Sequence, residues 1–437
     1  MISALVDSFK ITDLRRRIIF TLALIAVFRV GTFIPTPGID AAALTEYFQK
    51  MEGTIIGFLN LFSGGAFENF SIFALGIMPY ISASIIIQLL TVVIPYLEKL
   101  SKEGEVGRKR ITQYTRYGTI VLSLIQSTGL SFWMQSIQGS DGASIVYNPG
   151  LSFHLMSVIT LTSGTTFIMW LGEQITERGI GNGISLIIFA GIIAGMPGAI
   201  ANTIKSLYTG EMNIFTVLFI VILMIAVTAA VIIMLLGQRK IMVQYAKKIV
   251  GRKVYGGQST HIPLLINQAG VIPVIFASSI LAFPSTIGTF FGKGNATIST
   301  ILSYLERGKP VYSLVYVSAI IFFTYFYTAV IFNPTDVADN MRKYGGFVPG
   351  IRPGKPTADY IEKVLGRITL VGAVFLALIA LLPDLLISWA KVSFYFGGTA
   401  LLIVIGVGLD TIKQVESHLL MRHYEGFMKK GKMRGRR

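Results

Sequence analysis

Most of the chain consists of apolar runs of about 20 residues, which carry few charged side chains and are separated by polar connections. A run of this length and composition spans the hydrocarbon core of a bilayer as one α-helix. The runs lie at residues 18–34, 71–94, 114–134, 152–171, 183–203, 214–236, 264–290, 311–332, 368–389 and 393–410. The pattern predicts an all-α, multi-pass membrane protein with ten transmembrane helices.

One local pattern occurs twice, at the head of the second run and of the seventh. Gly76-Ile-Met-Pro79-Tyr-Ile81 precedes a face of serine and alanine, as does Gly270-Val-Ile-Pro273-Val-Ile275, 194 residues later. Each copy places a helix-breaking glycine, and a proline expected to kink the helix, before an isoleucine. Five runs precede the connection at 206–213 and five follow it, so related halves would be inverted repeats with an active path between them. A chance match is the alternative, because these small residues are common in membrane helices.

Composition and charge agree with a membrane setting. Of all residues, 53% are apolar and 14% are charged, and lysine and arginine gather at every second connection, while 136–151 contains neither. By the positive-inside rule, both termini are expected in the cytoplasm. The chain contains no cysteine, which excludes a disulfide, a thiolate nucleophile and a cysteine-bound metal.

Ionisable residues are missing from the centres of the predicted spans. Arg29, Arg116, Glu173 and Asp384 all lie towards span ends. Ion-coupled transporters normally keep such a group at the midplane, so an inverted-repeat secondary transporter of a small solute is the less favoured alternative. An intramembrane enzyme would need a nucleophile–base or carboxylate pair, and the only possible base for the span serines is His154, whose place near the outer end of its span favours ordinary interfacial placement. The chain has no phosphate-binding loop, so we expect neither an enzyme nor a bound cofactor, and nucleotide hydrolysis would belong to a partner.

An apolar, glycine-rich segment begins at Gly57 and is too short to cross the membrane. Such a segment at membrane depth must be buried against protein or line a cavity. It is either a re-entrant or interfacial loop, or a mobile stopper that fills the mouth of a pathway and can leave it because little fixes it.

Four long segments resemble the SecY/Sec61-alpha family, the central channel subunits of Sec protein translocases. The similar segments cover residues 73–90, 178–185, 269–279 and 347–354, and the resemblance extends over essentially the whole chain. It implies a protein-conducting channel that translocates unfolded secretory polypeptides and releases membrane-protein helices sideways through a lateral gate. In such a channel the two halves surround a central pore that a short plug helix and a ring of aliphatic side chains seal at rest.

The resemblance also assigns residues to these parts. The ring positions are all isoleucine, namely Ile81, Ile85, Ile184, Ile188, Ile275 and Ile403. The plug segment is 57–68, with Gly57, Phe58, Leu59, Asn60, Leu61, Phe62, Ser63, Gly64, Gly65, Ala66 and Phe67 as its candidate residues. Candidates for the lateral gate between the second and seventh spans are Gln88, Asn267 and Gln268. Taken singly, each isoleucine is more often lipid-facing or packed on another helix, and polar residues in spans also serve as ordinary interhelical contacts.

The family's two long cytoplasmic loops dock a motor or a ribosome. Matching basic residues here are Arg239, Lys240, Lys247, Lys248, Arg252, Lys253 and Arg352. Positive-inside topology and contact with lipid headgroups explain part of this charge. The partners that the resemblance implies are the small membrane subunits SecE and SecG, the SecA motor ATPase, the ribosome and nascent chain, signal sequences and preproteins; the basic surfaces suit anionic lipids.

These assignments divide the chain into parts, in a protein expected in the bacterial plasma (inner) membrane. They are a cytoplasmic amphipathic N-terminus (1–17), a first five-helix half (18–205), an external hinge (206–213), a second half (214–410) with cytoplasmic loops at 238–262 and 333–367, and a basic cytoplasmic tail (411–437).

Overall fold

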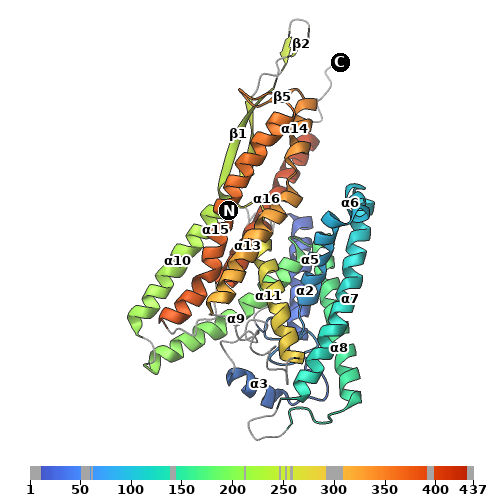
Figure 1. Ribbon diagram of the computed structural model, residues 1–437, viewed down its shortest axis with the longest axis vertical. Helices are drawn as coiled ribbons and strands as arrows, with labels where there is room; N and C mark the ends of the chain where they lie inside the picture. The colour runs from blue at the N-terminus through green and yellow to red at the C-terminus, as the bar shows by residue number, and fades with distance from the viewer. Residues whose placement is uncertain are drawn as a thin grey trace. The chain divides into compact units, whose positions relative to one another are not determined.

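The computed structural model describes residues 11–50, 60, 63–137, 144–210, 213–245, 248–250, 253–255, 259–291, 309–390 and 398–430. The chain is mostly helical, as predicted (Figure 1). The helices are α2 (Thr12–Gly31), α3 (Ala41–Lys50), α5 (Met78–Val93), α6 (Pro95–Lys102), α7 (Glu105–Gln135), α8 (Leu151–Arg178), α9 (Gly183–Tyr208), α10 (Ile214–Leu236), α11 (Ile272–Phe291), α13 (Pro310–Ile331), α14 (Pro334–Lys343), α15 (Lys355–Ala390) and α16 (Gly398–Lys430). The strands are β1 (Gln238–Tyr245), β2 (Lys248–Val250), β3 (Lys253–Tyr255), β4 (Ser259–Leu265) and β5 (Gly346–Phe347).

Every apolar run of the sequence overlaps one of these helices, in the order α2, α5, α7, α8, α9, α10, α11, α13, α15 and α16. Among the described residues, six helical stretches are long and apolar enough to cross a membrane, in α8, α9, α10, α13 with α14, α15 and α16. The pair α5 and α6 makes a seventh if it counts as one span bent by 99°. The bend follows from Pro95, the first residue of α6, because proline forces the preceding residue out of the helical region, and Ile94 is extended.

Several predicted boundaries are wrong. The second run was expected to be helical from 71 and the seventh from 264, yet α5 begins at Met78 and α11 at Ile272, after turns. Residues 264 and 265 instead end strand β4, and hydropathy alone does not separate a strand end from a helix start. Downstream, α9 extends to Tyr208, into the predicted hinge, and α16 continues to Lys430, through most of the predicted tail, because polar residues do not by themselves end a helix.

The chain forms two compact units. The first comprises Met1–Tyr208, Ser279–Arg307 and Ile403–Arg437, and the second comprises Thr209–Ser278 and Gly308–Leu402. In the first unit, α7 packs against both α5 and α8, and α2 contacts α8 and α9. Figure 1 shows α7 and α8 side by side along most of their lengths.

Small side chains make the close packing of α7 possible. A stripe at every fourth position of this helix is buried, and it consists of Thr115, Thr119, Ser123, Ser127 and Ser131. The Ser127 Oγ atom lies 3.3 Å from Thr162 Oγ1 of α8. Residues with this spacing lie on one helix face, and small residues there let two helices approach closely.

The second unit carries a small sheet with the strand order β4-β1-β5. Strands β1 and β4 are antiparallel from Gln238 opposite Leu265 to Gln244 opposite Ser259, and Gln244 also pairs with Phe347 of β5. Buried Ile241, Val243 and Leu264 form a core with Met341, Val348 and Ile361. The sequence did not predict this sheet. The sequence signal for a strand here is the alternation of buried and exposed side chains, in which exposed Met242 separates buried Ile241 and Val243.

Candidate functional site

The two copies of the glycine–proline pattern fold in the same way. Gly76 and Gly270 adopt positive φ angles of 56° and 63°, and a helix begins two residues after each glycine. Pro79 and Pro273 are therefore the second residues of α5 and α11, where the missing N–H is not needed. The prediction that these prolines kink their helices is wrong, since they begin them. Ile81 and Ile275 consequently occupy the same, fourth, position of α5 and α11.

The candidate ring residues come from four helices. Ile81 and Ile85 lie on α5, Ile184 and Ile188 on α9, Ile275 on α11 and Ile403 on α16. All are buried except Ile184, which is half-buried. Ile184 packs on α8 at Gly172, where an added Cβ would meet its Cδ1 atom at 2.6 Å. Five of these residues belong to the first unit and Ile275 to the second, and their convergence on one ring stays a prediction.

The described part of the plug segment is Asn60 and residues 63–68; positions 57–59, 61 and 62 lie outside the described residues. Asn60 and Glu68 close this segment with two bonds, since Asn60 Nδ2 donates to Glu68 Oε2 at 3.0 Å and Asn60 Oδ1 accepts from the Glu68 N–H at 3.0 Å. Inside the loop, Ser63 Oγ donates to the Asn60 carbonyl and accepts from the Phe67 N–H. The described part of the segment is thus a turn held together by hydrogen bonds between its own residues.

An aromatic cluster anchors the end of this turn. The Phe67 ring lies edge-on to Phe48 at a centroid distance of 5.5 Å and stacks on Trp133 at 6.1 Å. Phe67 and Ala66 are almost completely buried, in a core that also includes Leu44, Phe70 and Met134. The expectation that little fixes the segment is therefore wrong for residues 63–68, because a buried phenylalanine in such a core is costly to withdraw.

The candidate gate residues make mainly local contacts. Gln88 Nε2 donates to Ser84 Oγ, one turn earlier on α5, at 3.0 Å. Asn267 is buried, and its Nδ2 atom donates to the Gly270 carbonyl at 2.8 Å, which stabilises the turn before α11. Two buried acceptors, Asn267 Oδ1 and Gln268 Oε1, have no hydrogen-bond partner within the described residues. Buried acceptors without a partner are uncommon in folded proteins, so these two oxygens are available to accept further hydrogen bonds at this turn.

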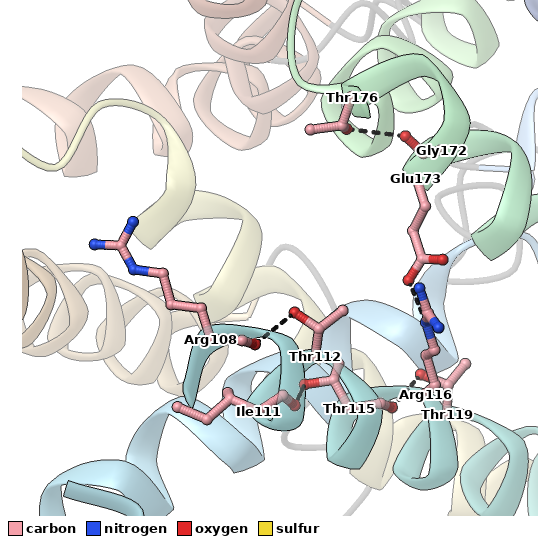
Figure 2. Close-up of polar contacts among 9 residues, drawn as sticks. All are labelled: Arg108, Ile111, Thr112, Thr115, Arg116, Thr119, Gly172, Glu173 and Thr176. Atoms are coloured by element: carbon pink, nitrogen blue, oxygen red, sulfur yellow. Dashed lines mark hydrogen bonds and ion pairs between the residues drawn. The ribbon is translucent and has the colours of Figure 1, made fainter. Parts of the chain in front are cut away.

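An ion pair that the sequence did not predict joins α7 to α8. Figure 2 shows Arg116 and Glu173 pointing towards each other from these two helices, and the Nε–Oε1 distance is 2.8 Å. The Glu173 side chain is 13% exposed and that of Arg116 is 44% exposed, so the pair lies at the edge of the helix interface. Nearby threonine hydroxyls donate hydrogen bonds to backbone carbonyls one turn earlier. The Thr119 hydroxyl donates to the Thr115 carbonyl (2.8 Å), and the Thr176 hydroxyl donates to the Gly172 carbonyl (2.9 Å). Sequence alone gave no signal for this pair, because its partners are 57 residues apart.

The basic docking candidates divide between described and undescribed positions. Arg239 and Lys240 are exposed on β1, and Arg352 is exposed just before α15. Arg352 lies in a turn that a buried threonine holds, because Thr357 Oγ1 donates to the Arg352 carbonyl at 2.9 Å. Lys248 and Lys253 belong to β2 and β3, while Lys247 and Arg252 lie outside the described residues. Since β5 pairs with β1, the sheet joins the two loops that carry these residues.

Comparison with known proteins decides the family. The family model described as SecY matches residues 71–412, which include both glycine–proline helix starts, the sheet and all six candidate ring isoleucines. The chain belongs to the SecY family. It is 54% identical over 425 residues to the protein translocase subunit SecY of Escherichia coli (strain K12), covering 97% of this chain and 96% of that protein. The corresponding subunit of Vibrio cholerae serotype O1 is 50% identical over 431 residues, covering 97% and 96%.

Solved structures support the SecY fold. A protein-conducting channel matches with a TM-score of 0.65 and 18% identity over 92% of this chain and 91% of that one. Sec61 from a canine ribosome–channel complex matches with a TM-score of 0.61 and 18% identity over the same shares of both chains. Channels of this kind are ten-helix membrane proteins, which agrees with the ten helices that cover the apolar runs here. The protein is therefore a multi-pass membrane protein with the SecY architecture.

Proposed function

We propose that this protein is the central channel subunit of a bacterial protein translocase, which moves unfolded secretory polypeptides across the plasma membrane and releases membrane-protein helices sideways. The observation that carries the proposal is its 54% identity, over almost the full length of both chains, to a protein translocase subunit SecY. A secondary transporter is not favoured, because the matching proteins are named as protein translocase subunits and protein-conducting channels.

The six isoleucines form the waist of the pore in this proposal. A translocating chain presents every side chain and backbone group in turn, so fixed polar partners would trap it. Aliphatic side chains make weak, non-directional contacts and exclude water from a narrow constriction. In support, Ile81 and Ile275 share one position of two similarly built helices, and Ile188 and Ile403 are almost completely buried.

The plug segment closes this waist at rest, and the seam between α5 and α11 is the lateral gate. The hydrogen bonds between Asn60 and Glu68 support the first assignment, since they hold the described part of the segment together as a compact stopper. Small residues on α5 and α11 support the second: Ala83, Ala277, Ser278 and Ser279 are all buried. Gln88, Asn267 and Gln268 would lie at this seam. A signal sequence that binds the parted seam better than the closed one would shift the gate towards opening.

The exposed basic residues of the two loops dock an anionic partner surface, and Arg352 presents its charge at a tight turn. A SecA motor, or a ribosome, is the partner class that fits, because guanidinium and ammonium groups bind carboxylate and phosphate. In the solved structures, Sec61 and Ssh1 are bound to ribosomes, which supports a ribosome partner for this chain. SecE and SecG as membrane subunits, anionic lipids around the channel and cytoplasmic termini complete the proposal, and hydrolysis of nucleotide belongs to the motor.

Single cysteines test the pore directly, because the chain contains no native cysteine. Each ring isoleucine is replaced by cysteine, and a secretory polypeptide is stalled in the channel in native membranes. We expect disulfide or maleimide crosslinks from these positions to the polypeptide. Ile159 and Ile225 are matched controls on α8 and α10, because their side chains are 64% and 66% exposed and face away from the packed interior. Crosslinks from the controls and none from the six ring positions would overturn the pore assignment.

A further inference from the structure

We propose that Arg29 is a positioning residue that latches the plug segment in its closed place. Arg29 lies in the last turn of α2, and its Nη1 atom donates to the Gly64 carbonyl at 2.5 Å. The same guanidinium lies over the Phe33 ring, 5.0 Å from its centroid. The inference rests on the proposed function, because it concerns what holds the plug.

The chemistry of this contact suits a latch. A guanidinium offers several N–H donors in a planar fork, so it binds a carbonyl and stacks on an aromatic ring at once. A bond from a charged donor to a carbonyl is roughly twice as strong as one between neutral groups. Breaking it leaves the partly buried Arg29 cation without this acceptor, which favours the docked turn.

The shape of the turn makes Gly64 the docking point. Gly64 and Gly65 have positive φ angles of 68° and 85°, so the chain reverses sharply here. A Cβ atom at Gly64 would lie 2.8 Å from the Cα atom of Gly191 on α9 and 3.2 Å from Arg29 Nη1. The Gly64 backbone is therefore wedged between the α9 backbone and the Arg29 side chain, in a space that admits no side chain.

This location links the latch to the pore. Gly191 lies three residues after Ile188 on α9, so the two share a helix face. The plug turn thus rests one helical turn from a proposed ring residue. Phe67 anchors the opposite end of the turn in the aromatic core. Opening then requires the Gly64 end to leave Arg29 and α9, and the paired glycines allow the backbone to turn there.

The latch predicts which variants leak. In the purified full-length channel, reconstituted with its membrane subunits in planar bilayers, deletion of residues 60–67 is the reference for an absent plug. We expect Arg29→Gln to raise the resting ion conductance towards that reference, because the fraction of channels with an undocked plug should rise roughly tenfold. Arg29→Lys keeps the charge but not the fork, and we expect it to restore part of the seal.

Two glycine variants provide a matched pair. Gly64→Ala and Gly65→Ala place a side chain at similar positive φ angles, but a Cβ at Gly65 meets no atom within 4 Å. Gly64→Ala should therefore leak more than Gly65→Ala. As a second readout, a single cysteine at buried Ser63 should react with a maleimide faster in the Arg29→Gln background than with Arg29 present. This labelling measurement requires only that the chain is assembled in a membrane, and it does not depend on the conductance recordings.

The outcomes separate the latch from the plug. If the deletion leaks while Arg29→Gln neither leaks nor exposes the cysteine at position 63, Arg29 is not a latch and the plug stands. If the deletion leaves the conductance unchanged, the plug assignment itself is wrong. Equal leak from Gly64→Ala and Gly65→Ala would overturn the docking of Gly64 on α9.

Discussion

The Nε atom of Arg116 lies 2.8 Å from the Oε1 atom of Glu173, so one ion pair connects α7 with α8 across their interface. The sequence placed both residues near span ends but gave no sign that they meet. Because Glu173 is mostly shielded from water, the loss of its partner leaves a carboxylate with poor solvation.

A double-mutant cycle measures the value of this pair. We expect Arg116→Gln and Glu173→Gln each to lower the free energy of unfolding in detergent, with a coupling energy of about 1–3 kcal/mol between them. The exposed pair Lys109–Glu105, 3.0 Å apart in the same helix, is the control, and its coupling should stay below about 0.5 kcal/mol. Additive effects at Arg116 and Glu173 would show that the contact does not stabilise the α7–α8 interface.

Gly164 on α8 packs directly against the backbone of the turn that precedes α5. A Cβ atom at Gly164 would lie 1.8 Å from the Ile72 carbonyl oxygen, in the turn before α5. Gly164→Ala should therefore displace that turn and lower stability by about 1–3 kcal/mol, as overpacking does. Gly198→Ala on α9 is the control, since a Cβ there meets nothing within 4 Å. Thermal unfolding in detergent should show loss for the first variant and none for the second; equal melting temperatures would contradict the close approach.

The aromatic anchor of the plug segment yields a separate prediction. Phe67→Ala removes a buried ring that contacts Phe48 and Trp133, a loss typically worth about 3–5 kcal/mol in a packed core. Amide hydrogen exchange of residues 63–70 should become faster in this variant. Phe215→Ala, at a ring that is 75% exposed on α10, is the control and should leave that exchange unchanged. Unaltered protection in Phe67→Ala would mean that the turn is held by its hydrogen bonds alone.

Charge reversal at the tight turn before α15 tests partner docking. Arg352→Glu should lower motor- or ribosome-dependent translocation roughly tenfold, because it replaces an attractive charge with a repulsive one. Assembly in the membrane should be intact, since the side chain is exposed. Lys355→Glu, an exposed reversal nearby, controls for net charge and should have the smaller effect. Normal translocation by Arg352→Glu would show that Arg352 does not dock a partner and contributes only to the positive-inside topology.

Hydropathy located the helices well, because the requirement to span a bilayer acts on each segment separately. It located their ends poorly, as at Leu265, which ends a strand instead of extending a span. Strand pairing depends on a partner elsewhere in the chain, and the pairing of β1 with β5 joins residues about a hundred positions apart. Gly76 and Gly270, by contrast, marked helix starts that depend on neighbouring residues alone. A left-handed turn followed by proline specifies a helix start locally, although the role of the prolines as starts, not kinks, came from the structure.

The sequence by itself determined the membrane class, the order of the helices, the family resemblance and the isoleucine candidates, because apolar length, local turn chemistry and motif identity are all properties of contiguous residues. Only the tertiary structure decided that Arg29 meets Gly64, that Arg116 meets Glu173 and that Phe67 is held by Phe48 and Trp133. Those contacts join segments that are remote in the chain, and they depend on how closely small residues let the helices pack. The short apolar segment that looked loosely held in the sequence is, in its described part, a capped and anchored turn.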